Sequence, residues 1–199
     1  MEHTLTDPAP SDYNEFGVQV ALDGSLRAIT SDTSTQVIIF HGNSYIQTLT
    51  ETGAVKFGNA MDVYYDVGNA KRWVFVGSPL DDNGGTDRGS AYIYLNSSTT
   101  YNLYQKITAP DPADSQYFGS SVRYDHTTGL LYIGASGHSS GGGVCYIYKN
   151  NGDEFQLEQI IGPKTAGYSF GELLDADNGS MVTSAVGDTF AGIAYFYNS

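Results

Sequence analysis

The sequence predicts an all-β protein, a four-bladed β-propeller with four antiparallel strands in each blade, and three observations support this prediction. The chain of 199 residues is rich in Tyr, Phe and β-branched residues, which favour strands. Its 24 Gly residues, together with frequent Asn and Asp, favour tight turns between those strands. The dipeptide Phe-Gly occurs four times, and the same order of strand-forming segments follows each copy.

The four Phe-Gly copies define the expected blades. They lie 41 to 61 residues apart, which is about the length of one four-stranded blade. Each copy opens a strand, and three further strands follow it through hairpin turns; the second copy reads FGNAMDVYY, RWVFVGSP, GSAYIYL and NLYQKIT. We therefore expect a single domain over residues 1–199, with repeats that start at Phe16, Phe57, Phe118 and Phe170.

The fourth strand of the last repeat is missing, because the sequence stops just after AYFYN. The N-terminal segment TLTDPAPSDYNEFG parallels KITAPDPADSQYFG, and Leu5 and Ile107 each lie 11 residues before their Phe. We therefore expect the N-terminal strand to join the last blade. Closure of the ring in this way would protect the edges of the sheets.

Two motifs recur together with Phe-Gly. VGSP at Val76–Pro79 follows Phe57-Gly58, and IGAS at Ile133–Ser136 follows Phe118-Gly119. This pattern resembles the FG-GAP repeat found in the propellers of integrin α-chains and in many bacterial and phage surface proteins. The resemblance implies the propeller fold and a role in adhesion or recognition, whereas the fold itself does not determine the ligand.

The resemblance also raises the question of calcium, which many family members bind in the loop between the first and second strands. In this sequence only LDADNGS approaches such a motif, with Asp175, Asp177 and Asn178 as candidate oxygen ligands, and it lacks the later acidic ligand. A plain hairpin turn is the favoured interpretation. We expect calcium to be possible here but not required for folding, and no other cofactor.

The charge of the chain restricts its partners. Nine basic residues against 22 acidic ones give a formal net charge of −13, which repels nucleic acid and anionic lipid and suits a cationic partner. No apolar run is long enough to span a membrane, so we expect no membrane insertion. The N-terminus shows no signal-peptide pattern. The expected location is extracellular or on a virion surface.

Three places are weak candidates for ligand contacts. The acidic loop with Asp81, Asp82, Asn83 and Asp87 could bind a cation or a partner, or it could be a solvated connector. Trp73 could stack on a sugar ring if it is exposed. His138 lies in a loop rich in Ser and Gly, but no GxSxG elbow and no metal-ligand spacing of histidines accompanies it. We therefore expect no enzymatic activity.

The expected function is that of a non-catalytic binding or structural module displayed on an outer surface, for example a phage decoration, fibre or tail-associated protein. Its partners would be a protein or a glycan at the loop-bearing faces, or neighbouring chains in a larger assembly. Two alternatives are a sugar-binding, lectin-like adhesin and an enzyme that acts on polysaccharide.

Overall fold

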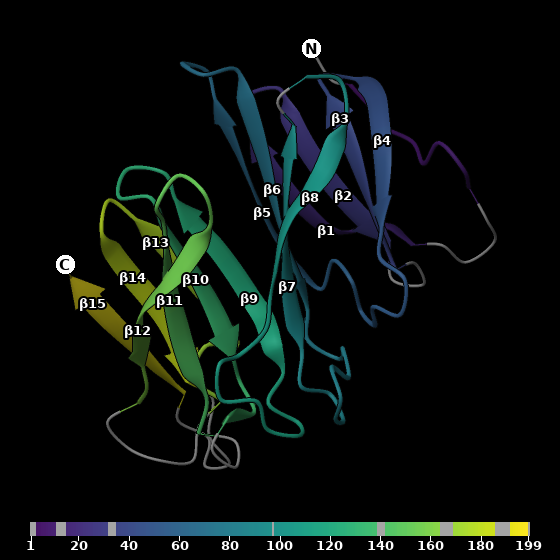
Figure 1. Cartoon of the computed structure of the whole chain (residues 1–199). Coiled ribbons are helices and arrows are strands. Elements are labelled where there is room, and N and C mark those ends of the chain that lie inside the picture. Colours follow the sequence, from purple (N-terminus) through teal and green to yellow (C-terminus); the bar gives the residue numbers. More distant parts are fainter. Residues whose placement is uncertain are drawn as a thin grey trace.

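The computed structural model describes residues 3–10, 15–31, 35–96, 98–138, 142–163, 169–185 and 192–198. Within these residues the regular elements are fifteen β-strands. They form four antiparallel sheets that follow one another along the chain, and each sheet is one blade (Figure 1). The strands of each blade pair with their neighbours in sequence.

The four blades have the following strands. Blade 1 contains β1 (Phe16–Asp23), β2 (Leu26–Ser31), β3 (Gln36–His41) and β4 (Ser44–Thr50). Blade 2 contains β5 (Ala60–Asp66), β6 (Lys71–Ser78), β7 (Ser90–Asn96) and β8 (Tyr101–Ile107). Blade 3 contains β9 (Phe118–Asp125), β10 (Leu130–Ala135), β11 (Val144–Asn150) and β12 (Phe155–Ile161). Blade 4 contains β13 (Leu174–Asp177), β14 (Ser180–Ala185) and β15 (Ile193–Asn198).

The first strand of each blade is its inner strand. Strand β5 lies between β1 and β9, and β13 lies beside β9, so the inner strands follow the order of the blades. The sequence-based prediction of an all-β propeller with four blades is confirmed. This arrangement explains how residues far apart in the sequence meet at the inner strands.

The hydrophobic core consists of layers between successive blades. One layer joins β2 and β3 of blade 1 to blade 2, and it contains the fully buried Ile39 and Val74. A second layer, around Phe75 and Leu131, joins blade 2 to blade 3. A third, around Cys145 and Met181, joins blade 3 to blade 4. Strand alternation makes this possible, because the two faces of a central blade each meet a different neighbour.

The Phe of three Phe-Gly copies fills a repeated position in these layers. Phe57, Phe118 and Phe170 are at most 1% exposed. Each ring packs edge-on or tilted against two tyrosines from the third strand of its own blade, with ring centroids 5.2 to 6.5 Å apart. Such contacts between aromatic rings add to the stabilisation from burial. Phe16 differs from the other three because it is only partly buried.

The glycines of the two recurring motifs meet across blades. Gly77 of VGSP and Gly134 of IGAS lie against the backbone of Gly119 and Gly171, which are the Phe-Gly glycines of the next blade. A Cβ on Gly77 or Gly134 would overlap a carbonyl group there. Both motifs therefore need Gly because two backbones approach without room for a side chain.

The N-terminal segment lies on blade 1. Leu5 packs against a cluster formed by Ile29, Ile38 and Phe40. In the part of the chain that the structure describes, the last sheet has three strands, and no hydrogen-bonded fourth strand from the N-terminal segment joins it. Residues 11–14 of that segment lie outside the described residues. The expected closing strand is thus not found, whereas the blades themselves are as predicted.

Across the described ranges, no helix has the length and apolar character needed to cross a membrane.

Candidate ligand-binding site

The hairpins that join the first and second strands of the blades surround a cavity of about 620 Å³, which we call the axial mouth. All four blades contribute to its wall, because the inner strands converge at this end. Its polar and aromatic lining comprises Asp23, Tyr64, Tyr65, Asp66, Asp62, Arg123, Tyr124, His126, Asp175 and Asp177. Five aspartates therefore face one arginine, so the mouth is acidic.

Arg123 connects three blades across the axial mouth. Its Nε donates to Oδ1 of Asp175 at 2.8 Å, and its Nη1 donates to Oδ1 of Asp62 at 3.3 Å. Burial raises the pKa of Asp62, although the backbone amide of Tyr124 and the charge of Arg123 oppose this shift. The carboxyl of Asp62 thus belongs to the framework, while Asp175 remains largely open to solvent, with a side chain that is 65% exposed.

Aromatic rings form one side of the axial mouth. Tyr64 and the exposed His126 stack with their ring centroids 5.1 Å apart, and Tyr124 lies next to Tyr64. A second cavity of about 300 Å³ adjoins this pair between blades 2 and 3, and Asp66, Lys71, Trp73, Tyr104 and Asn150 also line it. Flat rings beside carboxylate and amide groups provide both apolar contact and hydrogen bonding for a ligand.

Three aspartates fix the inner ends of the blades to one another. Each accepts a hydrogen bond from a backbone N–H of the next blade: Asp23 from Tyr65 (2.7 Å), Asp62 from Tyr124 (2.8 Å) and Asp125 from Gly179 (2.6 Å). Hydrogen bonds to a charged acceptor are stronger than neutral ones. The hairpins around the mouth are thereby held in place without help from a ligand.

Asp125 is the most constrained of these aspartates. It is 1% exposed and also accepts hydrogen bonds from Thr127 and Thr128. Burial alone would raise its pKa, but the amide of Gly179 and these threonines outweigh burial and hold the pKa far below the usual range. Asp125 is therefore ionised at neutral pH and ties blade 3 to blade 4.

The acidic loop that the sequence indicated as a candidate site is largely a structural element. Asp81 is 2% exposed, and its carboxylate accepts hydrogen bonds from Val55 N, Ser78 Oγ and Tyr92 Oη. Its ion-pair partner is Lys106, with the nitrogen 3.5 Å from the carboxylate. These donors enclose the carboxylate of Asp81 inside the loop, so it does not face solvent.

The other residues of this loop also bond within the protein. Asn83 donates to the carbonyl oxygen of Gly89 and to the hydroxyl of Ser90. Asp82 accepts the backbone N–H of Asp87 at 3.3 Å. Arg88 pairs with Asp114 of the next connector at 2.9 Å instead of with the acids of its own loop. Asp82 and Asn83 are exposed at the end of the blade opposite the axial mouth.

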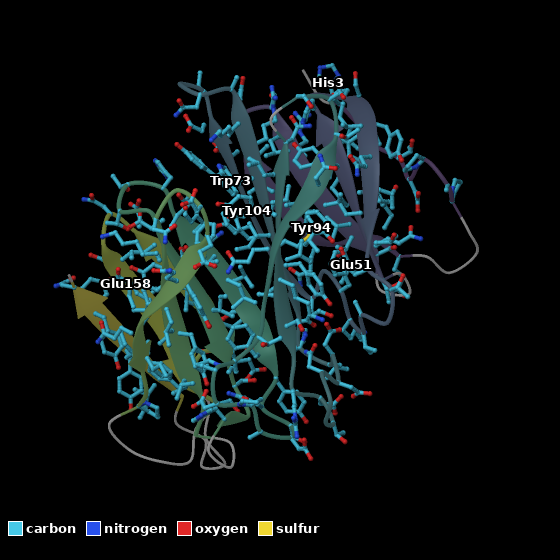
Figure 2. The ribbon with its side chains drawn as sticks, viewed as in Figure 1. His3, Glu51, Trp73, Tyr94, Tyr104 and Glu158 are labelled. Carbon is cyan, nitrogen blue, oxygen red and sulfur yellow. The ribbon has the colours of Figure 1, made fainter. Side chains whose placement is uncertain are left out.

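Trp73 does not lie on the surface. It is 8% exposed and packs between blades 2 and 3, where Phe75 stacks on it and Tyr104 and Phe155 meet it edge-on. Figure 2 shows Trp73 and Tyr104 beside one another in this layer. The expected exposure of Trp73 is not found, since neighbouring rings cover most of it, although it lines the 300 Å³ cavity.

His138 forms a polar contact with the connector between blades 2 and 3. Its Nε2 lies 3.0 Å from Oδ2 of Asp111, whose other oxygen accepts a hydrogen bond from Tyr146. Burial alone would raise the pKa of Asp111, but its bonds to Tyr146 and His138 lower it overall. The contact joins two connectors at the end of blade 3 away from the axial mouth.

The weak calcium candidate forms a two-residue hairpin. Asp177 pairs with Ser180, and Asn178 and Gly179 between them have φ angles of 50° and 78°, as a tight β-hairpin requires. Asp175 is engaged by Arg123. In the described ranges no group of three or more His, Cys, Asp or Glu residues is placed to hold a metal ion.

Comparison with known protein families bears on this architecture. Residues 101–148 match the model of the FG-GAP repeat. Over these residues the chain is similar to the FG-GAP repeat. The match runs from β8 through most of β11, and it includes Phe118-Gly119 and the IGAS segment. The FG-GAP resemblance of the sequence is therefore confirmed. A search of curated proteins returned no match to the chain.

Most residues of the axial mouth were not singled out from the sequence. Asp175 and Asp177 were, but as calcium ligands, while Asp62, Tyr64 and Arg123 were not. A signal was nevertheless present, because an Asp ends the inner strand before each hairpin turn in every repeat. Once a propeller is predicted, these hairpins must lie at the same end of the ring.

Proposed function

We propose that this protein is a non-catalytic binding module that recognises a cationic partner at the axial mouth. The observation that carries the proposal is the composition of the mouth, where side chains from all four blades place five aspartates around one arginine. The formal net charge of −13 acts in the same direction. Clefts lined by charges of one sign concentrate ligands of the opposite sign.

The rim of the mouth adds apolar contacts to the charge. Val67 lines it and is 74% exposed. A basic protein segment with apolar residues between its lysines or arginines fits both features. Electrostatic complementarity would steer such a segment, and the apolar rim would retain it.

A lysine-rich peptide with interspersed leucines is a suitable probe, and isothermal titration calorimetry measures its binding. We expect binding that weakens at high salt, and we expect Asp177→Asn to weaken it several-fold. Asp82→Asn removes the same charge at the opposite end of the blade and should leave the affinity unchanged. Equal effects of the two substitutions would show that net charge alone attracts the peptide and would contradict the proposal.

A sugar-binding function is the second candidate, and the stacked Tyr64 and His126 beside the 300 Å³ cavity favour it. An exposed ring face can stack on the apolar face of a pyranose, while Asp66 and Asn150 can bond to its hydroxyls. Titration with a neutral chito-oligosaccharide tests this candidate. Binding that is lost in His126→Ala would support it and would replace the cationic peptide as the ligand.

The setting that we propose is an outer surface, such as that of a virion, where the module would act as a decoration, fibre or tail-associated protein. Its acidic surface and its preorganised mouth suit recognition there. Immunogold labelling of native particles tests this location. Hydrolysis of a glycan or an ester that disappears in His138→Ala would contradict the non-catalytic part of the proposal.

A further inference from the structure

Successive blades meet through one recurring interface, in which the front face of a blade covers the back face of the next. The front face carries a cross-strand pair from the second and third strands: Ala28–Ile39 in blade 1, Phe75–Ile93 in blade 2 and Tyr132–Ile147 in blade 3. All six residues are at most 7% exposed. They are buried because the next blade packs on them.

The back face is built from the inner strand. Its apolar residues lie four and six positions after the Phe of Phe-Gly, and they are Met61 and Val63 in blade 2, Val122 and Tyr124 in blade 3, and Leu174 and Ala176 in blade 4. Each pair packs in the hydrophobic cluster that its blade shares with the preceding one. Three interfaces in one chain thus use the same two sets of positions.

The two terminal blades carry the same residue types, but these are exposed. On the front of blade 4, Val182 and Phe196 form the equivalent cross-strand pair and are 40% and 67% exposed. On the back of blade 1, Val20 and Leu22 occupy the two equivalent positions and are 68% and 67% exposed. Contiguous apolar surface of this kind is typical of an interaction site.

The backbone of blade 4 is also suited to a further neighbour. Gly89 and Gly143 precede the third strands of blades 2 and 3, and each lies against the Phe of the next Phe-Gly pair without room for a Cβ. Gly192 also precedes the third strand of its blade, and among the described residues no atom lies within 4 Å of the position that its Cβ would take. Blade 4 therefore has Gly at the position where blades 2 and 3 have the Gly that meets the next inner strand.

We propose that the front face of blade 4 binds the back face of blade 1 in a second copy of this chain. The occupant is a second copy because blade 1 of the same chain lies beyond the two central blades (Figure 1). Val20 and Leu22 there remain more than half exposed. Two copies that each offer one front and one back face close head to tail into a ring of eight blades.

The second copy supplies the contacts that the three internal interfaces already show. Phe196 and Val182 would pack on Val20 and Leu22, as Phe75 and Ile93 pack on the inner strand of blade 3. Burial of these apolar side chains provides the driving force, since Val20, Leu22 and Phe196 are 67% to 68% exposed and Val182 is 40% exposed. The contact joins a front face to a back face, so it is a heterologous, head-to-tail contact.

Size-exclusion chromatography with light scattering, over roughly 1 to 100 µM protein, measures the association. We expect a mass of twice 21.4 kDa at the upper concentrations. Phe196→Asp places a charge on the apolar front face, and Val20→Asp places one on the apolar back face. Each variant alone should remain monomeric. An equimolar mixture of the two should form dimers again, because one intact front face and one intact back face remain. Leu103→Asp, at an exposed position on β8, is the matched control and should dimerise like the wild type.

Several results would overturn the inference. A mass of one chain at every concentration would do so. Protection of β1 and β15 from hydrogen exchange in such a monomer would show that the ring closes within one chain. Dimers that persist in both single variants would place the interface elsewhere. Failure of the mixture to restore association would exclude a head-to-tail contact. Near-ultraviolet circular dichroism checks the fold, and Phe196→Ser and Val20→Ser replace either variant that unfolds.

Discussion

Substitution of Gly134 by Ala tests whether the glycine of the IGAS segment is required by contact between blades. The Cβ of Ala at this position would lie 2.8 Å from the carbonyl carbon of Gly171 in blade 4 and closer still to its oxygen. Backbone cannot rotate away as a flexible side chain does, so blades 3 and 4 would have to separate. Overpacking of this kind costs about 1–3 kcal/mol, and we expect a value near the upper limit, about 3 kcal/mol.

Thermal and urea unfolding of the monomeric protein measure this effect. For a domain of this size the loss corresponds to a Tm lower by roughly 6–12 °C. Gly68→Ala is the matched control, because the nearest atom to its Cβ would be Oδ1 of Asp66 at an ordinary 3.5 Å. The control should leave stability unchanged or slightly higher. A Gly134→Ala protein as stable as the control would refute the packing role of the motif.

Four further predictions concern stability. Phe118→Ala should lower the free energy of unfolding in urea by about 3–5 kcal/mol, as for other buried aromatics, whereas the exposed Leu173→Ala should change it by less than about 0.5 kcal/mol. Asp125→Asn should destabilise by about 1–3 kcal/mol at pH 7. Because the pKa of Asp125 is lowered in the folded state, that difference should shrink as pH falls below about 4; a constant difference would contradict the cause. Deletion of residues 1–8 should lower Tm and promote aggregation, since Leu5 covers apolar residues of blade 1; unchanged melting and solubility would contradict this. A chelator should shift Tm little, and a large drop that calcium alone restores would show an obligatory site.

The architecture was predictable because one local pattern recurs with its physical reasons intact. Phe-Gly opens every repeat, and in the last three repeats Phe fills the layer between blades while Gly permits the close approach. The turn residues and strand composition then supply the other strands. The N-terminal segment was different. Its sequence resembles an outer-strand segment, but Leu5 packs on the face of blade 1, where Ile29, Ile38 and Phe40 offer apolar surface. Among the described residues this similarity of sequence is not accompanied by hydrogen bonds to the last blade.

The candidate site was less predictable, because burial and hydrogen bonding depend on the neighbouring blade. Asp81 looks like a surface acid in the sequence, yet three donors enclose it. Trp73 looks available, yet three aromatic rings cover it. Conversely, Arg123 and Asp62 are unremarkable in the sequence and become partners only when the inner strands converge. Such pairings are set by the geometry between blades, which local patterns do not encode.

The bounds of the matched FG-GAP repeat are shifted by one strand relative to the bounds of a blade. The matched stretch, residues 101–148, begins with the outer strand of blade 2 and ends within the third strand of blade 3. A unit with the bounds of this match carries the last strand of one blade together with most of the following blade. Both ends of such a unit therefore lie within a sheet and not between two sheets. Duplication or deletion of a unit with these bounds would thus add or remove one blade, and backbone hydrogen bonds within a sheet would hold each junction.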